Sequence, residues 1–291
     1  MSRREHGREL ENQTALSTQG STVEGLDGRL DDTSCSMSWA SDLLGKCGLS
    51  YVVYQALYRA VLFFEIDALD GRNEFAALQL FCFGAAVFLS YLGARDVREE
   101  YKKVEAIGKS GGKETPARCY TRTAAASRIC EVHFAYQIIN LVISIKLEGL
   151  SQPEMIGHHV MAAALALEAR RAGLFQWYSL YFLAVSEIST IPLCIMAWFE
   201  QFPRFLELHW AMRIIDTVSQ FTFAGLFVFF RIFAWAYLSK DFWLDSIALI
   251  RQKRHHSLPA ILMFQSVNVL LSVLQLYWLS LIVEGALKLG S

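Results

Sequence analysis

The sequence predicts an all-α fold, a polytopic bundle of six to seven transmembrane helices. Hydrophobic residues make up 54% of the 291 residues and charged residues only 19%, whereas a soluble domain carries about 25% charged residues. Several stretches of about 20 predominantly apolar residues are long enough to cross a bilayer as a helix. No alternating pattern is long enough to indicate a membrane barrel.

The expected spans differ in how clearly the sequence marks them. Four runs are predominantly apolar, and one of them contains Pro192, which predicts a kink or a break: they are residues 74–94, 173–199, 210–238 and 260–288. Two further runs, residues 124–148 and 153–170, are shorter or more polar. Residues 51–68 contain Arg59 and Glu65, so this segment decides between six and seven spans.

Composition divides the chain into three parts. Residues 1–50 are polar and have too little apolar surface to offset the entropy of ordering, so we expect a disordered tail. They contain no apolar core of a signal peptide. Residues 51–120 would form two helices and a charged loop, and residues 121–291 the main transmembrane domain.

Basic residues predict the orientation in the membrane. With seven spans, one side of the bilayer receives 19 Lys and Arg residues and the other side receives three. Positive residues accumulate on the cytosolic side, so we expect the N-terminus in the cytosol. Asn12 begins an N-glycosylation sequon, and a glycan there would contradict this orientation.

Composition and motifs also exclude several functional classes. A net charge of −1 gives no indication of a nucleic-acid partner. The six cysteines form no C-x-x-C pair, so we expect neither a metal site nor a disulfide framework. Glycine-rich nucleotide loops are absent from the sequence, and no bound cofactor is expected.

Ionisable residues inside a bilayer are costly and are therefore candidates for function. His158 and His159 follow Pro153, which favours the first turn of a helix. Consecutive helical residues point about 100° apart, so one ring would face a cavity while the other packs or forms a hydrogen bond. Glu187 falls at nearly the same depth if the helices joined near residue 171 are antiparallel.

Two interpretations of these three residues stay open. A histidine and a carboxylate at one depth would form a proton-transfer couple, and an imidazole would also attack an activated acyl group. In the alternative, the groups hydrogen-bond one another and only hold the helices together.

Other polar residues in the apolar runs are weaker candidates. Glu131 and His133 lie near the start of their helix. Arg213 and Asp216 would pair near the membrane interface, and Arg231 would extend to the lipid headgroups.

Four short motifs occur in a consistent order. They are Pro153-Glu-Met-Ile-Gly-His158-His159; Ser186-Glu187-Ile188-Ser189-Thr190-Ile191-Pro192 followed by Trp198; Arg231 in FVFFRIF; and Gln275-Leu-Tyr-Trp278 followed by Ile282, Gly285 and Lys288. Together they resemble the TLC-domain family, which includes the ceramide synthases. Tyr136 and Asn140 stand where its small members have Tyr-x-x-x-Asp, with Asn in place of Asp. The His-Asp-x-x-Asp segment of ceramide synthases has no match at residues 186–189.

The resemblance implies a helical bundle of the endoplasmic reticulum that acts on membrane lipids in lipid homeostasis. As an enzyme it would transfer an acyl group from acyl-CoA, as co-substrate, to a long-chain amine, which is the chemistry of ceramide and sphingolipid synthesis. The catalytic candidates are His158, His159 and Glu187, and the substrate-binding candidates are Tyr136, Asn140, Ser189, Asp216, Arg231 and Trp278. The alternatives are a non-catalytic sensor or regulator of membrane lipid composition and a cargo adaptor.

Overall fold

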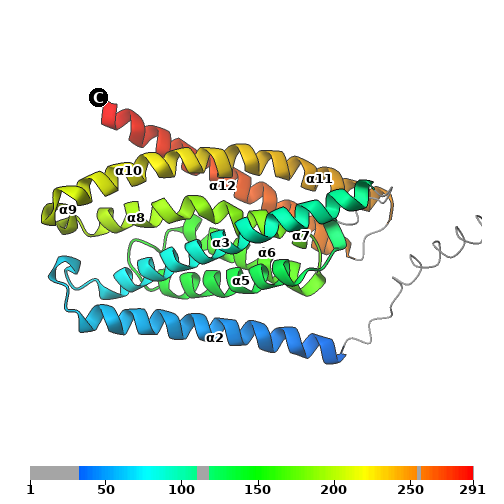
Figure 1. Cartoon of the computed structure of the whole chain (residues 1–291), viewed down its shortest axis with the longest axis horizontal. Helices are drawn as coiled ribbons and strands as arrows, with labels where there is room; N and C mark the ends of the chain where they lie inside the picture. Colours follow the sequence, from blue (N-terminus) through cyan, green and yellow to red (C-terminus); the bar gives the residue numbers. More distant parts are fainter. Residues whose placement is uncertain (1–32, 110–117, 254–256, 291) are drawn as a thin grey trace, which may run out of the picture. The chain divides into compact units, whose positions relative to one another are not determined.

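The computed structural model describes residues 33–109, 118–253 and 257–290. The chain divides into two units, Met1–Ser41 and Asp42–Ser291, and the described part of the first unit is the beginning of one helix. Within the described residues all regular structure is helical, which confirms the all-α fold class. The long helices of the second unit run side by side (Figure 1).

The elements follow one another along the chain as helices joined by short connections. Their bounds are α2 (Thr33–Phe63), η2 (Asp67–Leu69), α3 (Asn73–Lys109), α5 (Ala124–Ser144), α6 (Pro153–Ala172), α7 (Gln176–Phe182), η3 (Val185–Ser189), α8 (Thr190–Gln201), α9 (Arg204–Leu208), α10 (Trp210–Leu226), η4 (Phe227–Ala234), α11 (Trp235–Arg251) and α12 (Leu258–Gly290). The elements η2 and η3 are 3-10 helices, and η4 is a π-helical stretch that joins α10 and α11 without a break.

Four helical segments in the described part of the chain are long and apolar enough to cross a membrane. They are Asn73–Ala106, Gln176–Gln201, Trp210–Arg251 and Leu258–Lys288, and they coincide with the four clearest runs of the sequence. Helices α5 and α6, with 21 and 20 residues, are long enough but too polar to qualify. Their polar side chains point into the bundle: Glu131, His133, Gln137, Asn140 and His159 are all buried.

Helix α2 begins within residues 1–50, most of which the sequence predicts to be a disordered tail. The helix begins at Thr33, so residues 33–50 are helical. Leu43 is buried, and Lys46 forms an ion pair with Glu131 of α5. These contacts supply the burial and the charge pairing that the polar composition did not predict. Residues 1–32, including the sequon at Asn12, lie outside the described residues.

Two prolines mark local features of the fold: Pro192 follows the helix break that the sequence predicts, and Pro153 begins α6. The helix break lies at η3, one turn before Pro192, because a proline ring clashes with the carbonyl four residues earlier. Gly93 of α3 packs against this break, where an added Cβ would lie 2.9 Å from the Ala184 Cβ and from the Val185 nitrogen. At the start of α6, Gln152 is the N-cap without a side-chain hydrogen bond, and Pro153 occupies the first turn.

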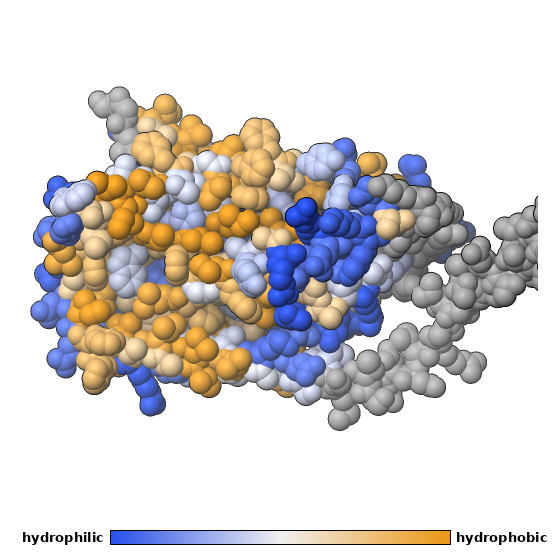
Figure 2. Space-filling view, in the orientation of Figure 1, coloured by the Kyte–Doolittle hydropathy of each residue, from blue (hydrophilic) through white to orange (hydrophobic). Residues whose placement is uncertain are grey.

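The surface of the second unit is apolar over most of its length. Figure 2 shows hydrophobic side chains over α2, α3, α8 and α10, with hydrophilic residues gathered near the end of α3. Phe221, Phe233 and Tyr237 are 74%, 67% and 65% exposed. Such a surface is unfavourable in water and matches the apolar interior of a bilayer.

Partly buried charge pairs lie near the last turns of α6 and α11. Arg118 contacts Asp245 with two hydrogen bonds of 2.6 and 2.7 Å, and Tyr178 donates to the same carboxylate at 2.6 Å. Arg170 Nε lies 2.5 Å from Glu131 Oε1. The contacts of Asp245 tie the segment that precedes α5 to α7 and α11, and the Arg170–Glu131 pair ties α6 to α5.

Candidate functional site

A small polar cavity lies inside the helical bundle. Five polar residues line it, each from a different element: His133 of α5, His158 of α6, Glu187 of η3, Arg231 of η4 and Gln275 of α12. Apolar residues complete the wall, namely Ala162, Leu165, Phe182, Leu183, Trp235 and Leu271. The volume within the cavity that the centre of a water molecule can occupy is about 20 Å³, which is room for one or two water molecules.

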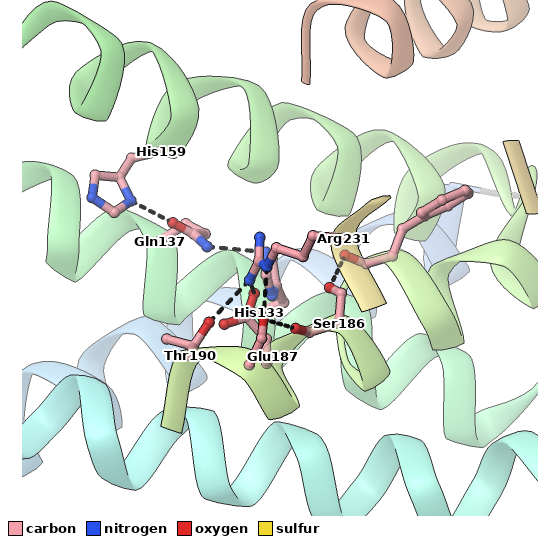
Figure 3. A network of polar contacts seen from close by, with 9 residues as sticks. His133, Gln137, His159, Ser186, Glu187, Thr190 and Arg231 are labelled. Atoms are coloured by element: carbon pink, nitrogen blue, oxygen red, sulfur yellow. Dashed lines mark hydrogen bonds and ion pairs between the residues drawn. The ribbon is translucent and has the colours of Figure 1, made fainter. Parts of the chain in front are cut away.

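Arg231 points into the bundle and joins η4 to η3. Its Nε donates to Ser189 Oγ at 2.9 Å, and its Nη2 donates to Thr190 Oγ1 at 2.9 Å. The same Nη2 lies 3.4 Å from Glu187 Oε1 (Figure 3). Arg231 is only 8% exposed, so the expectation that it reaches the lipid headgroups is wrong. The inward position is favourable because three oxygen acceptors compensate its buried charge.

The π-helical stretch explains how this inward position is held. In η4 the backbone N–H of Trp235 bonds to the carbonyls of Phe230 and Ile232. The Phe230 carbonyl also accepts a hydrogen bond of 2.5 Å from the hydroxyl of Tyr181. Insertions of this kind concentrate at functional sites, and here the insertion carries the one arginine that lines the cavity.

A hydrogen-bonded chain of three side chains ends at the cavity. His159 Nδ1 lies 2.6 Å from Gln137 Oε1, and Gln137 Nε2 lies 3.1 Å from His133 Nε2 (Figure 3). His159 is 7% exposed, and both other residues are 1% exposed. His159 is therefore held by α5 and is separated from the cavity, while His158 lines it.

Three of the residues around the cavity have polar atoms without a hydrogen-bond partner. They are His133 Nδ1, His158 Nδ1 and Gln275 Oε1, and the described residues contain only three other buried atoms of this kind. Buried polar groups are nearly always hydrogen-bonded, so their concentration at one cavity indicates a place for a polar ligand group or for water.

The structure brings some of the predicted site residues together. His158 and Glu187 share the cavity, Ser189 bonds to Arg231, and the Trp278 ring lies 5.3 Å from the His158 ring. The imidazole rings of His158 and His159 face different neighbours, as their helical spacing predicts.

Other predicted residues lie apart from the cavity. The Tyr136 ring is 6.0 Å from the His133 ring, and Asn140 Oδ1 accepts a hydrogen bond of 2.9 Å from Cys82; neither residue lines the cavity. Asp216 accepts a hydrogen bond from Gln220 at 3.0 Å, and Arg213 bonds to the Leu206 carbonyl. The expected Arg213–Asp216 pair does not form, because both side chains have these nearer partners.

Sequence reasoning missed four residues of the site or gave them too little weight. His133, Gln137, Thr190 and Gln275 are placed there by the fold. The spacing of His133 and Gln137 puts them on one face of α5, and two polar residues on one face of an apolar helix are a usable signal. Gln275 and Thr190 lack such a spacing signal, although both stand within the family motifs.

Cysteines and metal-binding side chains are dispersed in the described part of the chain. No three His, Cys, Asp or Glu residues there lie close enough to hold a metal ion. Cys47, Cys82, Cys119, Cys130 and Cys194 are free thiols.

Apolar spans around an internal cavity with five polar lining residues define an integral membrane protein with an internal polar site. A family model described as the TLC domain matches residues 80–284. The match covers more than half of the chain, so the protein belongs to the TLC-domain family. The matched region begins within α3, upstream of the expected domain boundary at residue 121. No curated protein and no solved structure matches the chain.

Proposed function

We propose that this TLC-domain protein transfers an acyl group from acyl-CoA to the amino group of a long-chain lipid amine, as a ceramide synthase does. The observation that carries the proposal is the shared cavity of His158 and Glu187, in which His158 Nδ1 has no partner. His159 is the poorer candidate because Gln137 already engages its Nδ1.

The chemistry requires one imidazole near the thioester carbon. His158 attacks this carbon with the lone pair of one ring nitrogen, the carbon–sulfur bond breaks, and the proton on the other ring nitrogen passes to the departing CoA sulfur. The amine then attacks the acyl-imidazole, loses a proton and releases His158 with the amide product. In a direct transfer, His158 instead accepts the amine proton while the amine attacks the thioester. Glu187, held by Arg231, orients the polar end of the substrate.

A second cavity supports an acyl-chain site next to the polar one. The two cavities share five lining residues: Leu165, Phe182, Leu183, Trp235 and Leu271. The second cavity is predominantly apolar and continues along Phe175, Phe242 and Phe264. The volume within it that the centre of a water molecule can occupy is about 30 Å³. An acyl chain therefore enters only when side chains such as Trp235 move.

The closed interior also favours a second candidate function, a non-catalytic lipid sensor. A bundle that opens only when a lipid enters would couple lipid concentration to a change in helix packing. The buried Arg231–Glu187 contact between η4 and η3 is an interaction that such an opening would break.

We further propose that the protein lies in the membrane of the endoplasmic reticulum with a cytosolic N-terminus. The excess of Lys and Arg on one side supports this orientation. The cytosolic side is also where acyl-CoA would reach the apolar cavity, past the ends of α7 and α11.

An acyl-transfer assay on purified protein in detergent tests the function. Labelled acyl-CoA is supplied with a panel of sphingoid bases and lysolipids. We expect product from the wild type and a loss of about 10²-fold or more in His158→Ala. The control His209→Asn changes a histidine outside the cavity that caps α10 and keeps a capping side chain, so its activity should be unchanged. Folded wild type that acylates no acceptor, but whose unfolding temperature rises with one of these lipids, would support the sensor instead.

A further inference from the structure

The hydrogen-bonded chain from His159 to His133 has a defined direction. A carboxamide oxygen only accepts and a carboxamide NH₂ only donates. Gln137 Oε1 lies 2.6 Å from His159 Nδ1, so His159 Nδ1 carries a proton. Gln137 Nε2 lies 3.1 Å from His133 Nε2, so His133 Nε2 presents a lone pair. The shorter distance suits N–H···O and the longer one suits N–H···N, which supports this orientation of the amide.

This direction sets the tautomer of His133. A neutral imidazole whose Nε2 accepts a hydrogen bond carries its proton on Nδ1. His133 is 1% exposed and its Nδ1 has no hydrogen-bond partner. The backbone carbonyl of Leu183 lies near the ring but outside hydrogen-bond geometry. His133 therefore presents an unpaired N–H donor in the wall of the polar cavity.

None of the other polar groups that line the cavity forms a hydrogen bond with this donor. Glu187 is the only carboxylate among the lining residues, and its contact is with Arg231. His158 Nδ1 and Gln275 Oε1 are unpartnered as well. The cavity thus combines a fixed donor, His133, with a second imidazole, His158, that has no partner to fix its role.

We propose that His133 donates its Nδ1–H to the carbonyl oxygen of the acyl thioester, and that Gln137 and His159 are positioning residues that hold His133 in this tautomer. The inference rests on the proposed acyl transfer and names the group that receives the carbonyl.

During attack by His158 or by the amine, the carbonyl oxygen gains negative charge. The His133 N–H stabilises that charge, and its proton stays on the ring when the carbon–sulfur bond breaks and the carbonyl forms again. A fixed donor of this kind contributes about 10²–10³ to kcat. The two cavity histidines therefore have opposite roles, one as donor and one as base or nucleophile.

The decisive variant is Gln137→Glu. A carboxylate has no N–H to donate, so His133 would place its proton on Nε2 and present a lone pair to the cavity. His133→Leu removes the donor altogether, and His133→Asn restores an N–H of different reach. Because all of these sites are buried, each variant is first checked for cooperative thermal unfolding in detergent.

Two measurements test the proposal. Nitrogen-15 NMR of histidine-labelled protein identifies which ring nitrogen of His133 is protonated; we expect Nδ1 in the wild type and Nε2 in Gln137→Glu. In the transfer assay, kcat should fall about 10²–10³-fold in Gln137→Glu and His133→Leu with KM changed little, and His133→Asn should recover part of the loss. A proton on Nε2 in the wild type, or folded His133→Leu that retains kcat, would overturn the inference.

Substrate analogues separate this inference from the proposed function. A ketone analogue of acyl-CoA keeps the carbonyl, whereas a thioether analogue lacks it. We expect His133→Leu to weaken binding of the ketone about 3- to 10-fold and to leave the thioether unchanged. Equal effects on both analogues would contradict a carbonyl contact. Wild type that binds neither analogue and forms no product would refute acyl transfer itself.

Discussion

Arg231 and Glu187 form a buried ion pair that joins the π-helical stretch η4 to the helix break η3, with Nη2 3.4 Å from Oε1. Their side chains are 9% and 5% exposed. The two residues are 44 positions apart in the chain, and both line the polar cavity. The pair thus links two irregular helical segments, η3 and η4, at the candidate site.

Removal of one partner from this pair should be strongly destabilising. Arg231→Met leaves the Glu187 carboxylate buried without its countercharge, which costs about 3–5 kcal/mol of unfolding free energy. The double variant Arg231→Met/Glu187→Met should recover much of this loss, because neither charge remains. Chemical denaturation in detergent measures both values. Lys240→Ala, in an exposed pair with Asp241 at 3.7 Å, should cost about 1 kcal/mol or less, and an equal cost at Arg231 would contradict the prediction.

Two glycines of α3 should respond in opposite directions to the same substitution. At Gly84 an added Cβ meets nothing within 4 Å, so Gly84→Ala should stabilise the protein by about 0.5–1 kcal/mol. At Gly93 the Cβ would lie 2.9 Å from Ala184 and Val185, so Gly93→Ala should destabilise it by about 1–3 kcal/mol. Unfolding in detergent compares the two variants. Stabilisation by Gly93→Ala would show that α3 does not hold the helix break in place.

Trp235 should control the connection between the two cavities. Its ring packs on Phe182 at 4.6 Å, and its Nε1 donates to Ser272. Trp235→Phe replaces the indole that lines both cavities with a smaller ring. We therefore expect the variant to transfer bulkier acyl chains, relative to smaller ones, at a higher rate than the wild type does. Competition between acyl-CoAs of different chain length measures the ratio. Phe233→Ala, at a residue that is 67% exposed, should leave the ratio unchanged, and a shift of equal size there would exclude a specific role of Trp235.

Cys119 should be poorly reactive while the Arg118–Asp245 pair is intact. Burial raises the pKa of the Cys119 thiol above its usual value, and the charge of Asp245 adds to this rise while that of Arg118 opposes it. A raised pKa means that less thiolate is present at pH 8, so alkylation is slower. Single-cysteine variants labelled with a maleimide should show slower labelling at Cys119 than at the half-exposed Cys47. Asp245→Asn should accelerate labelling of Cys119, because it weakens the contacts of Arg118 and Tyr178; an unchanged rate would show that these contacts do not protect the thiol.

Glycan mapping should show the orientation of the chain. With a cytosolic N-terminus and seven spans, Asn12 stays unmodified when the protein is expressed in eukaryotic cells, and a sequon in a tag added after Ser291 becomes glycosylated. Endoglycosidase treatment followed by electrophoresis measures both. A glycan on Asn12, or an unmodified tag, would contradict the arrangement.

The amino-acid sequence by itself determined that the protein lies in a lipid bilayer and that its fold is helical. It also determined the four clearest spans and the family. These properties depend on averages along the chain, such as hydropathy over about 20 residues, or on local rules, such as the effect of Pro192 on the preceding turn. These properties do not depend on which other helices a segment packs against. The family motifs likewise mark His158, Glu187 and Arg231 without reference to any contact in the fold.

Only the tertiary structure decided what the marked residues contact. Helical spacing shows that His158 and His159 face different directions, but the packing of α5 against α6 decides that His159 meets Gln137 and that His158 lines the cavity. Arg231 turns inward because Ser189, Thr190 and Glu187 compensate its charge, and these acceptors are about 40 residues away in the chain. The free energy of a buried polar group depends on its partners, and those partners exist only after the helices pack.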